Sequence, residues 1–349
     1  MPEPVPSACS NKIANAGVIA ALLVVAVHVA GRSYDVCSPM WFWEQFVHYG
    51  ICLTAVPAFF TFSGYFLARH VDEGGWWREE CHKRIRTLLV PYLFCALFYA
   101  LLIVMTSVAA NVVHGRIIGI EHFGLKYWLK AVGCLPCDWP QLAPLWYLRA
   151  LMLFVVVSPI ALWCVKRFKC VGLAFLWALS ILIGFCSLTP ARLNLFLTRF
   201  VSVSGLLYFC VGMHLRVFGA SWLSSRKSRA YLCVCAGLML IVVSIYLQLV
   251  TGYEVHRVSR HLFVPLFLIG LWHFVPSGSF PAWLTHSVFP MYLLHIPIWF
   301  VINCITPFSV VTFSGWLVKW MVGIVGAVVI SVSLRRFANP IAVFVFGGR

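Results

Sequence analysis

Residues 13–31 read IANAGVIAALLVVAVHVAG, and this stretch decides the class of fold. It has no charged side chain and, as a helix, it is long enough to cross a hydrocarbon core of about 30 Å, which takes about 20 residues. Lys12 precedes it, as in a secretory leader, but the run is longer than a leader's apolar region, contains the polar His28 and lacks a clear cleavage site. We therefore predict that it is the first membrane span.

Apolar runs of similar length recur along the whole chain. Of the 349 residues, 62% are apolar and 10% are charged, which lies far outside the composition of a soluble globular domain. We predict an all-α membrane protein with about ten transmembrane helices in one bundle and no internal repeat, so that residues 1–349 form a single membrane domain. The expected spans are residues 13–31, 46–68, 87–110, 145–165, 170–188, 198–216, 230–251, 261–275, 284–305 and 314–334.

The distribution of Lys and Arg predicts how these spans are oriented, because basic residues are retained on the cytoplasmic side. An N-terminus inside the cell puts twice as many basic residues on the cytoplasmic side as on the opposite side, so we expect both termini to be cytoplasmic. The net charge of +16 is divided among short loops rather than gathered on one soluble face. Topology and anionic membrane lipids account for most of it, and no nucleic-acid partner is expected.

Histidine is the leading candidate for chemistry within the membrane. All ten acidic residues are expected in loops or tails, so no predicted span contains a carboxylate, which argues against an ion-coupled transporter. His28 and His295, by contrast, lie well inside apolar runs, and His28 is expected toward the outer leaflet. A histidine in lipid needs a partner or a water-filled cavity. The residues alone leave two interpretations open for each: a hydrogen-bonded bundle histidine or a functional one.

A basic segment precedes the third span. It ends in HKRIRTLLVPYLF, whose Arg84 and Arg86 suit the phosphate oxygens of a nucleotide-bearing cosubstrate. Spacing alone favours the ordinary alternative, which is retention of positive charge on the cytoplasmic side.

Two other segments place polar side chains inside spans or at their ends. PLWYLRALM puts Trp146, Tyr147 and Arg149 near the outer face, where Trp and Tyr are ordinary interfacial anchors and Arg149 is less easily explained. FFTFSGYFLAR contains Ser63 and Gly64, which permit close helix packing or a local break.

The cysteines give little direction, because most of the 14 lie in apolar runs. Cys134 and Cys137 form a single CxxC in the longest outer loop, which is compatible with a disulfide. One such pair is weak evidence for zinc, so no metal site is expected.

The five segments that contain His28, Ser63, Arg84, Tyr147 and His295 resemble, in this order, the acyltransferase 3 family of polytopic membrane acyltransferases. In that family the first span ends in an aliphatic run closed by histidine, here ALLVVAVH, and the second carries an FF-x-x-SG-aromatic signature, here FFTFSGYF. A basic segment leading into a proline follows, here KRIRTLLVP, then a tryptophan segment, here LWYL, and an aromatic-leucine-x-histidine segment, here YLLH. The motifs are short, but the resemblance covers about residues 11–336.

The resemblance implies a multi-pass O-acyltransferase of a bacterial inner membrane. It would move an acyl group, usually acetyl, from cytoplasmic acyl-CoA to a hydroxyl of a cell-surface glycan or lipid-linked sugar, with acetyl-CoA as cosubstrate and no bound cofactor. By position, His28 would be the catalytic histidine, and Arg84 and Arg86 the basic pair associated with the donor. The remaining expected substrate-binding residues are Ser63, Trp146, Tyr147, Arg149 and His295.

Two positions depart from the family's pattern. Many relatives have an arginine eleven residues before the histidine, where this chain has Gly17, and this puts donor binding and activity in question. A glutamate that often follows the tryptophan segment is absent, although other branches have an arginine there, as Arg149 is here. Two rival functions therefore stay open: a glycolipid or small-molecule transporter, and a non-catalytic relative that binds acyl-CoA.

Overall fold

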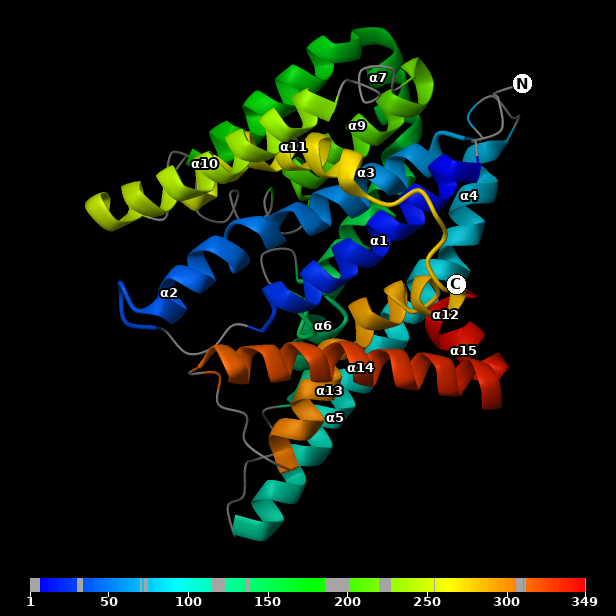
Figure 1. Ribbon diagram of the computed structural model, residues 1–349. Helices are drawn as coiled ribbons and strands as arrows, with labels where there is room; N and C mark the ends of the chain where they lie inside the picture. Colours follow the sequence, from blue (N-terminus) through cyan, green and yellow to red (C-terminus); the bar gives the residue numbers. More distant parts are fainter. Residues whose placement is uncertain are drawn as a thin grey trace.

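The computed structural model of the chain describes residues 7–29, 34–69, 71, 75–114, 123–135, 139–185, 197, 201–219, 227–253, 255–305, 310 and 312–348. Within these residues the chain forms helices and no β-strand, which confirms the all-α prediction (Figure 1). Seven of the described helices are long and apolar enough to cross a membrane, and Val203–Phe218 and Val258–Phe274 are shorter apolar helices. The chain is therefore a multi-pass membrane protein. The count of ten spans and the cytoplasmic termini stay predictions.

The helices follow the predicted apolar runs closely. In chain order they are α1 (Ser7–Val27), α2 (Pro39–Trp43), η1 (Glu44–His48), η2 (Ile51–Thr54), α3 (Ala55–Leu67), α4 (Trp76–Arg84), η3 (Ile85–Leu89), α5 (Val90–His114), α6 (Leu125–Ala131), α7 (Leu145–Phe185), α9 (Val203–Phe218), α10 (Lys227–Thr251), α11 (His256–Phe274), α12 (Ala282–Thr285), α13 (Val288–Ile305), α14 (Phe313–Phe337) and α15 (Asn339–Phe346). The short helices α2, α4, α6 and α15 lie outside every predicted span.

The fourth and fifth predicted spans form α7, which contains a sharp break. Lys169 has φ 49° and ψ −130° there, a conformation that no helix contains, so α7 consists of two helices. The break falls in the short basic connection expected between residues 165 and 170. The prediction of two separate helices here is therefore confirmed.

Two carboxylate-bearing segments differ from the prediction. Helical segments begin at Pro39 and at Trp76, whereas the corresponding spans were expected to begin at residues 46 and 87. Glu44, Glu79 and Glu80 therefore lie in helices, and the expectation that all ten acidic residues fall in loops or tails is wrong for these three. The π-helical segment η3 joins α4 directly to α5, whereas a turn at Tyr49 and Gly50 separates η1 from η2, and hydropathy alone reports neither arrangement. That no span contains a carboxylate stays a prediction.

A proline inside α7 explains how α4 is attached to it. Pro159 has no N–H and therefore leaves the Val155 carbonyl, one turn earlier, without its usual helix partner. Ser158 Oγ donates to this carbonyl at 2.7 Å, and Trp77 Nε1 of α4 approaches it at 3.3 Å. This contact of the Trp77 indole attaches α4 to α7.

Pro265 inside α11 has the same effect on the other half of α7. It leaves the His261 carbonyl without a helix donor, and Trp177 Nε1 of α7 donates to that oxygen at 2.9 Å. The second half of α7 is thereby attached to α11.

Close helix packing, expected from the Ser63–Gly64 pair, occurs between α3 and α9. A Cβ atom on Gly64 would overlap the Phe209 carbonyl, and one on Gly212 would overlap the Thr61 carbonyl. The two backbones can approach to this extent only because both positions lack a side chain. Gly64 therefore fixes the depth at which its neighbour Ser63 lies in the bundle.

The periphery of the bundle is apolar. In the apolar stretches of α10 and α14, only 17% of the residues are buried inside the protein, and Figure 1 shows α10 at an edge of the molecule. Their exposed large side chains include Leu232, Met239 and Val329. Such surfaces suit contact with lipid, and the buried core lies among α1, α3, α7, α9 and α13.

Candidate functional site

Two histidines from distant parts of the sequence stack on each other. His28 follows the last residue of α1 and is half-buried, whereas His295 lies in the middle of α13 and is fully buried. Their ring centroids are 5.3 Å apart and their planes differ by 28°. Both predicted intramembrane histidines therefore belong to one site, and His28 faces protein rather than lipid.

The orientation of His295 is fixed by its own helix. Its Nδ1 lies 2.8 Å from the Met291 carbonyl, which can only accept a hydrogen bond, so Nδ1 carries a proton and donates it. Trp299, one turn later, packs edge-on against the ring with centroids 5.2 Å apart. The Nε2 atom is buried and has no hydrogen-bond partner among the described residues. In the neutral ring this nitrogen therefore keeps an available lone pair.

Two further histidines pack on one tyrosine and were not singled out from the sequence. His48 of η1 packs against Tyr49, with ring centroids 4.6 Å apart, and His256 begins α11. Tyr49 links the second pair, because its ring stacks on His256 with centroids 4.4 Å apart. His48 lies near the start of the expected span 46–68. A polar side chain inside an apolar run is the sequence signal that could have identified it.

A hydroxyl pair joins α3 and α7 beside the histidines. Ser63 Oγ lies 3.2 Å from the Tyr147 hydroxyl, and the Tyr147 ring packs edge-on against Tyr292 with centroids 5.7 Å apart. Tyr292 donates its own hydroxyl to the Pro144 carbonyl. Because Tyr292 precedes His295 by three residues on α13, the two side chains share one face about 4.5 Å apart along the helix. The hydroxyl pair is thus joined to α13 through Tyr292, about one turn before His295.

Trp146 and Arg149 contact other parts of the protein. Trp146 packs on Trp139 and Phe60, with ring centroids 5.5 Å and 6.2 Å away. Arg149 is buried, and its Nη1 donates to the Gly133 carbonyl at 2.8 Å, just after α6. The structure therefore places Arg149 where it holds the loop after α6, a role that its position in the sequence did not reveal.

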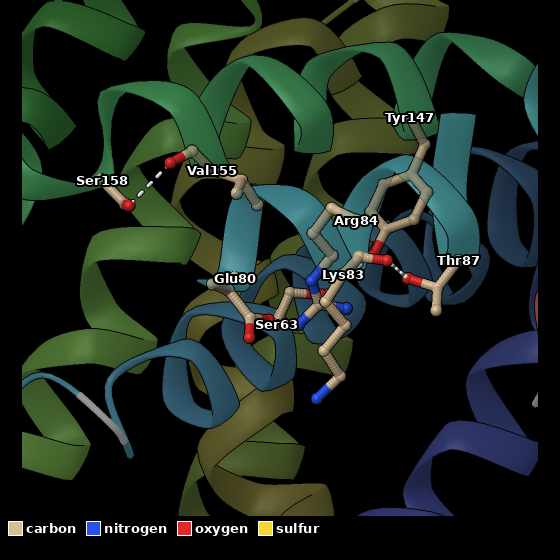
Figure 2. Close-up of polar contacts among 8 residues, drawn as sticks. All are labelled: Ser63, Glu80, Lys83, Arg84, Thr87, Tyr147, Val155 and Ser158. Carbon is tan, nitrogen blue, oxygen red and sulfur yellow. Dashed lines mark hydrogen bonds and ion pairs between the residues drawn. The ribbon is translucent and has the colours of Figure 1, made fainter. Parts of the chain in front are cut away.

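The two expected donor-binding arginines have different surroundings. Arg84 of α4 is half-buried and pairs with Glu80, one turn earlier, whereas Arg86 of η3 is exposed. Figure 2 shows Arg84 in one close-up with Ser63 and Tyr147, and in this view the guanidinium lies between Glu80 and the tyrosine. The two arginines therefore differ in burial and in pairing, because Glu80 holds Arg84 and Arg86 is exposed.

Gly17 lies on the same face of α1 as His28, because eleven residues correspond to about three helical turns. The position is buried, yet an added Cβ would meet no described atom within 4 Å outside its own stretch of helix. Among the described residues there is therefore room for at least a methyl group where many relatives have an arginine.

The CxxC pair is only partly within the described residues. Cys134 is exposed, and Cys137 lies outside the described residues, so the disulfide stays a prediction.

Comparison with known proteins identifies the chain through a family model. Residues 18–336 match the model described as an acyltransferase domain, which is nearly the whole chain. The matched region contains His28, Ser63, Arg84, Tyr147 and His295, which are the residues just described. No curated protein and no solved structure gives a match. The match over most of its length shows that this multi-pass membrane chain belongs to the acyltransferase 3 family.

Proposed function

We propose that this protein is a membrane O-acyltransferase that moves an acyl group, expected to be acetyl, from cytoplasmic acyl-CoA to a hydroxyl of a cell-surface glycan or lipid-linked sugar. The observation that carries the proposal is the His28–His295 stack in a chain of this family. A half-buried imidazole next to a fully buried and oriented one is a suitable centre for moving a proton within a membrane.

The reaction requires one base and one leaving group. His28 takes the proton of the acceptor hydroxyl as that oxygen attacks the thioester carbonyl, the carbon–sulfur bond breaks, and the CoA sulfur leaves with the electron pair and receives a proton. A second route has the His28 imidazole attack the thioester first and then pass the acyl group to the hydroxyl. In both routes His295 holds the first ring in position by stacking.

The donor is proposed to enter from the cytoplasmic end of the bundle. Arg84 and Arg86 supply positive charge for the phosphates of acyl-CoA, and Glu80 holds the Arg84 guanidinium in place. On the proposed topology, with both termini cytoplasmic, the acyl-bearing arm reaches His28 from inside while the acceptor arrives from outside. A single domain in a bacterial inner membrane is part of the same proposal.

The acceptor side is proposed to include the hydroxyl pair. Ser63 and Tyr147 can exchange hydrogen bonds with a sugar hydroxyl, and the Tyr147 ring packs against Tyr292 of α13. Trp146 offers an aromatic surface of the kind that sugars pack on, and Arg149 shapes the loop above it through Gly133.

One observation favours a second candidate function. The open space at Gly17 leaves the donor without the arginine that many relatives have, which suits a non-catalytic protein that only binds acyl-CoA. A transporter would likewise form no covalent product.

Radiolabelled acetyl-CoA distinguishes these functions. Membranes that contain the wild-type protein are expected to transfer label to an extractable glycan or glycolipid, and His28→Gln is expected to reduce the rate by a factor of about 100 to 10,000, as for loss of a general base. His286→Gln is the matched control, because His286 is exposed at the end of α12. Absence of labelled product with folded wild-type protein, or equal transfer by His28→Gln, would contradict the proposal.

A further inference from the structure

A large cavity lies on a different face of α1 from the histidine pair. Its volume is about 1190 Å³, above the range of about 300 to 1,000 Å³ typical of small-ligand sites. Helices α1, α3, α7, α9 and α11 line it, mostly with aliphatic and aromatic side chains. Ala16, Ala20 and Leu23 form the α1 side, spaced as one helix face, while His28 and Val25 pack toward α13.

The cavity is elongated along the helices. His261 and His273 both line it and are twelve residues apart on α11, which corresponds to about 18 Å at 1.5 Å per residue. Lys12 and Leu23 on α1 give about 16 Å in the same way. Half of a bilayer's hydrocarbon core is about 15 Å thick. The cavity therefore has the length of one hydrocarbon chain in a single leaflet.

Polar and basic side chains gather where α1 begins and α11 ends. The Lys12 ammonium group lies over the Trp272 ring, 4.9 Å from its centroid, and His273 is the next residue along. His214 of α9 also lines the cavity, and its Nε2 is 3.8 Å from Cys170 Sγ. His273 Nε2 and His214 Nδ1 are buried nitrogens with no hydrogen-bond partner among the described residues, and so is His261 Nε2, twelve residues before His273 on α11. None of the described residues that line the cavity is acidic.

We propose that this cavity binds the hydrocarbon chain of an anionic phosphate amphiphile, with the phosphate beside Lys12, His214 and His273. Apolar walls exclude a polar ligand from most of the length, and the positive charge of Lys12 distinguishes this end from the His261 end. A phosphate here would supply the hydrogen bonds that His273 Nε2 and His214 Nδ1 lack among the described residues. The shared chemistry fits two sources, a phospholipid of the leaflet or an isoprenyl phosphate. The site does not depend on acyl transfer and contains none of the residues assigned to it.

Photocrosslinking tests the site in the full chain. The protein is reconstituted in phosphatidylcholine vesicles that contain a trace of phosphatidic acid with a diazirine in its chain, or the tail-matched phosphatidylcholine probe. After illumination, labelled peptides are expected from α1 and α11, with about tenfold more labelling by the anionic probe, the factor that corresponds to one charge-assisted hydrogen bond. Equal labelling by the two probes would show ordinary lipid contact and overturn the proposal.

Variants separate the two ends of the site. Lys12→Gln combined with His273→Gln is expected to reduce anionic labelling to the phosphatidylcholine level. Ala16→Phe, which fills the cavity, is expected to reduce labelling about tenfold, whereas Ala14→Phe, at an exposed position two residues earlier, should not. Unchanged labelling in Ala16→Phe protein with a normal size-exclusion profile would overturn the proposal even if the double variant failed to fold.

Competition identifies the source of the phosphate. Unlabelled undecaprenyl phosphate and unlabelled dioleoyl phosphatidic acid are added separately to the crosslinking reaction. Stronger competition by either one supports the site and names its natural class of ligand. Failure of both to reduce labelling would overturn the proposal.

Discussion

The imidazole of His295 presents its Nε2 into the protein interior because its Nδ1 is committed to the Met291 carbonyl one turn earlier. This arrangement sets the tautomer of a fully buried ring against which His28 stacks. It also separates two roles: His28 is the group proposed to touch substrate, and His295 is a positioning residue.

Replacing His295 is therefore expected to separate stability from catalysis. In His295→Asn the amide can still donate to the Met291 carbonyl, whereas His295→Ala loses both this bond and the stacked ring. We expect both variants to lower kcat, by a factor of about 100 if the His28 ring shifts by about 1 Å. The asparagine variant should keep a melting temperature closer to wild type.

Initial rates of acetyl transfer and thermal unfolding in detergent micelles check this pair. His286→Asn serves as the control at an exposed position. A wild-type kcat in a folded His295→Ala protein would show that the buried ring does not position the base.

The two basic residues of the donor segment should differ in importance. Arg84 is half-buried and held by Glu80, whereas Arg86 is exposed, so we expect Arg84→Ala to raise the KM for acetyl-CoA about tenfold and Arg86→Ala to raise it less. Lys83→Ala is the matched control, because it removes a neighbouring exposed positive charge. An equal effect of all three variants would indicate general electrostatic attraction rather than a donor contact.

The hydroxyl pair can be tested by a double-mutant cycle. Ser63→Ala and Tyr147→Phe each remove one partner of the 3.2 Å contact, and each is expected to cost about 1 kcal/mol in the free energy of unfolding. Because the two hydroxyl groups are coupled, the double variant should lose less free energy of unfolding than the sum of the two single losses. If the pair also contacts the acceptor, the KM for the acceptor rises while that for acetyl-CoA does not.

Guanidinium or thermal unfolding of the three variants, with steady-state kinetics for both substrates, gives the result. If the losses in the two single variants add exactly in the double variant, the two hydroxyl groups are not coupled. An increase in the KM for acetyl-CoA alone would place the pair on the donor side.

Much of the helix pattern was readable from the sequence, and most of the site geometry was not. Long apolar runs identify spans directly, and the basic connection near Lys169 marked the break in α7. Hydropathy does not report helix rotation, so it could not show that His28 and His295 stack or that Arg149 turns toward Gly133. Such contacts join residues far apart in the chain.

The carboxylates show a second limit of sequence analysis. Low hydropathy at Glu44 predicts a loop there, yet this residue begins the π-helical segment η1, which follows α2 directly. π-Helices are rare and have no simple sequence signature. The same segment ends at His48, near the start of the expected span 46–68.

Gly17 offers a gain-of-function test. Gly17→Arg restores the usual family arginine at a buried position where an added Cβ meets no described atom. A melting temperature first shows whether this variant folds. If this position is part of the donor path, the KM for acetyl-CoA should fall, by about tenfold for one charge-assisted phosphate contact. Ala14→Arg, at an exposed position on the same helix, controls for added charge.

Titration with acetyl-CoA of the two variants and of the wild-type protein measures these KM values. An unchanged KM in folded Gly17→Arg protein would show that the open space does not lie on the path of acyl-CoA. Equal improvement in both variants would attribute the effect to net charge.

Two glycine-to-alanine substitutions should have opposite effects on stability. In Gly212→Ala the new methyl group overlaps the Thr61 carbonyl and forces α9 away from α3, which should cost about 1 to 3 kcal/mol or more and displace Ser63. In Gly17→Ala the methyl group enters open space, and better helix propensity should stabilise the protein by up to about 1 kcal/mol. Melting temperatures and acetyl transfer per folded molecule distinguish the two. A Gly212→Ala protein as stable and active as wild type would mean that the α3–α9 contact does not set the depth of the hydroxyl pair.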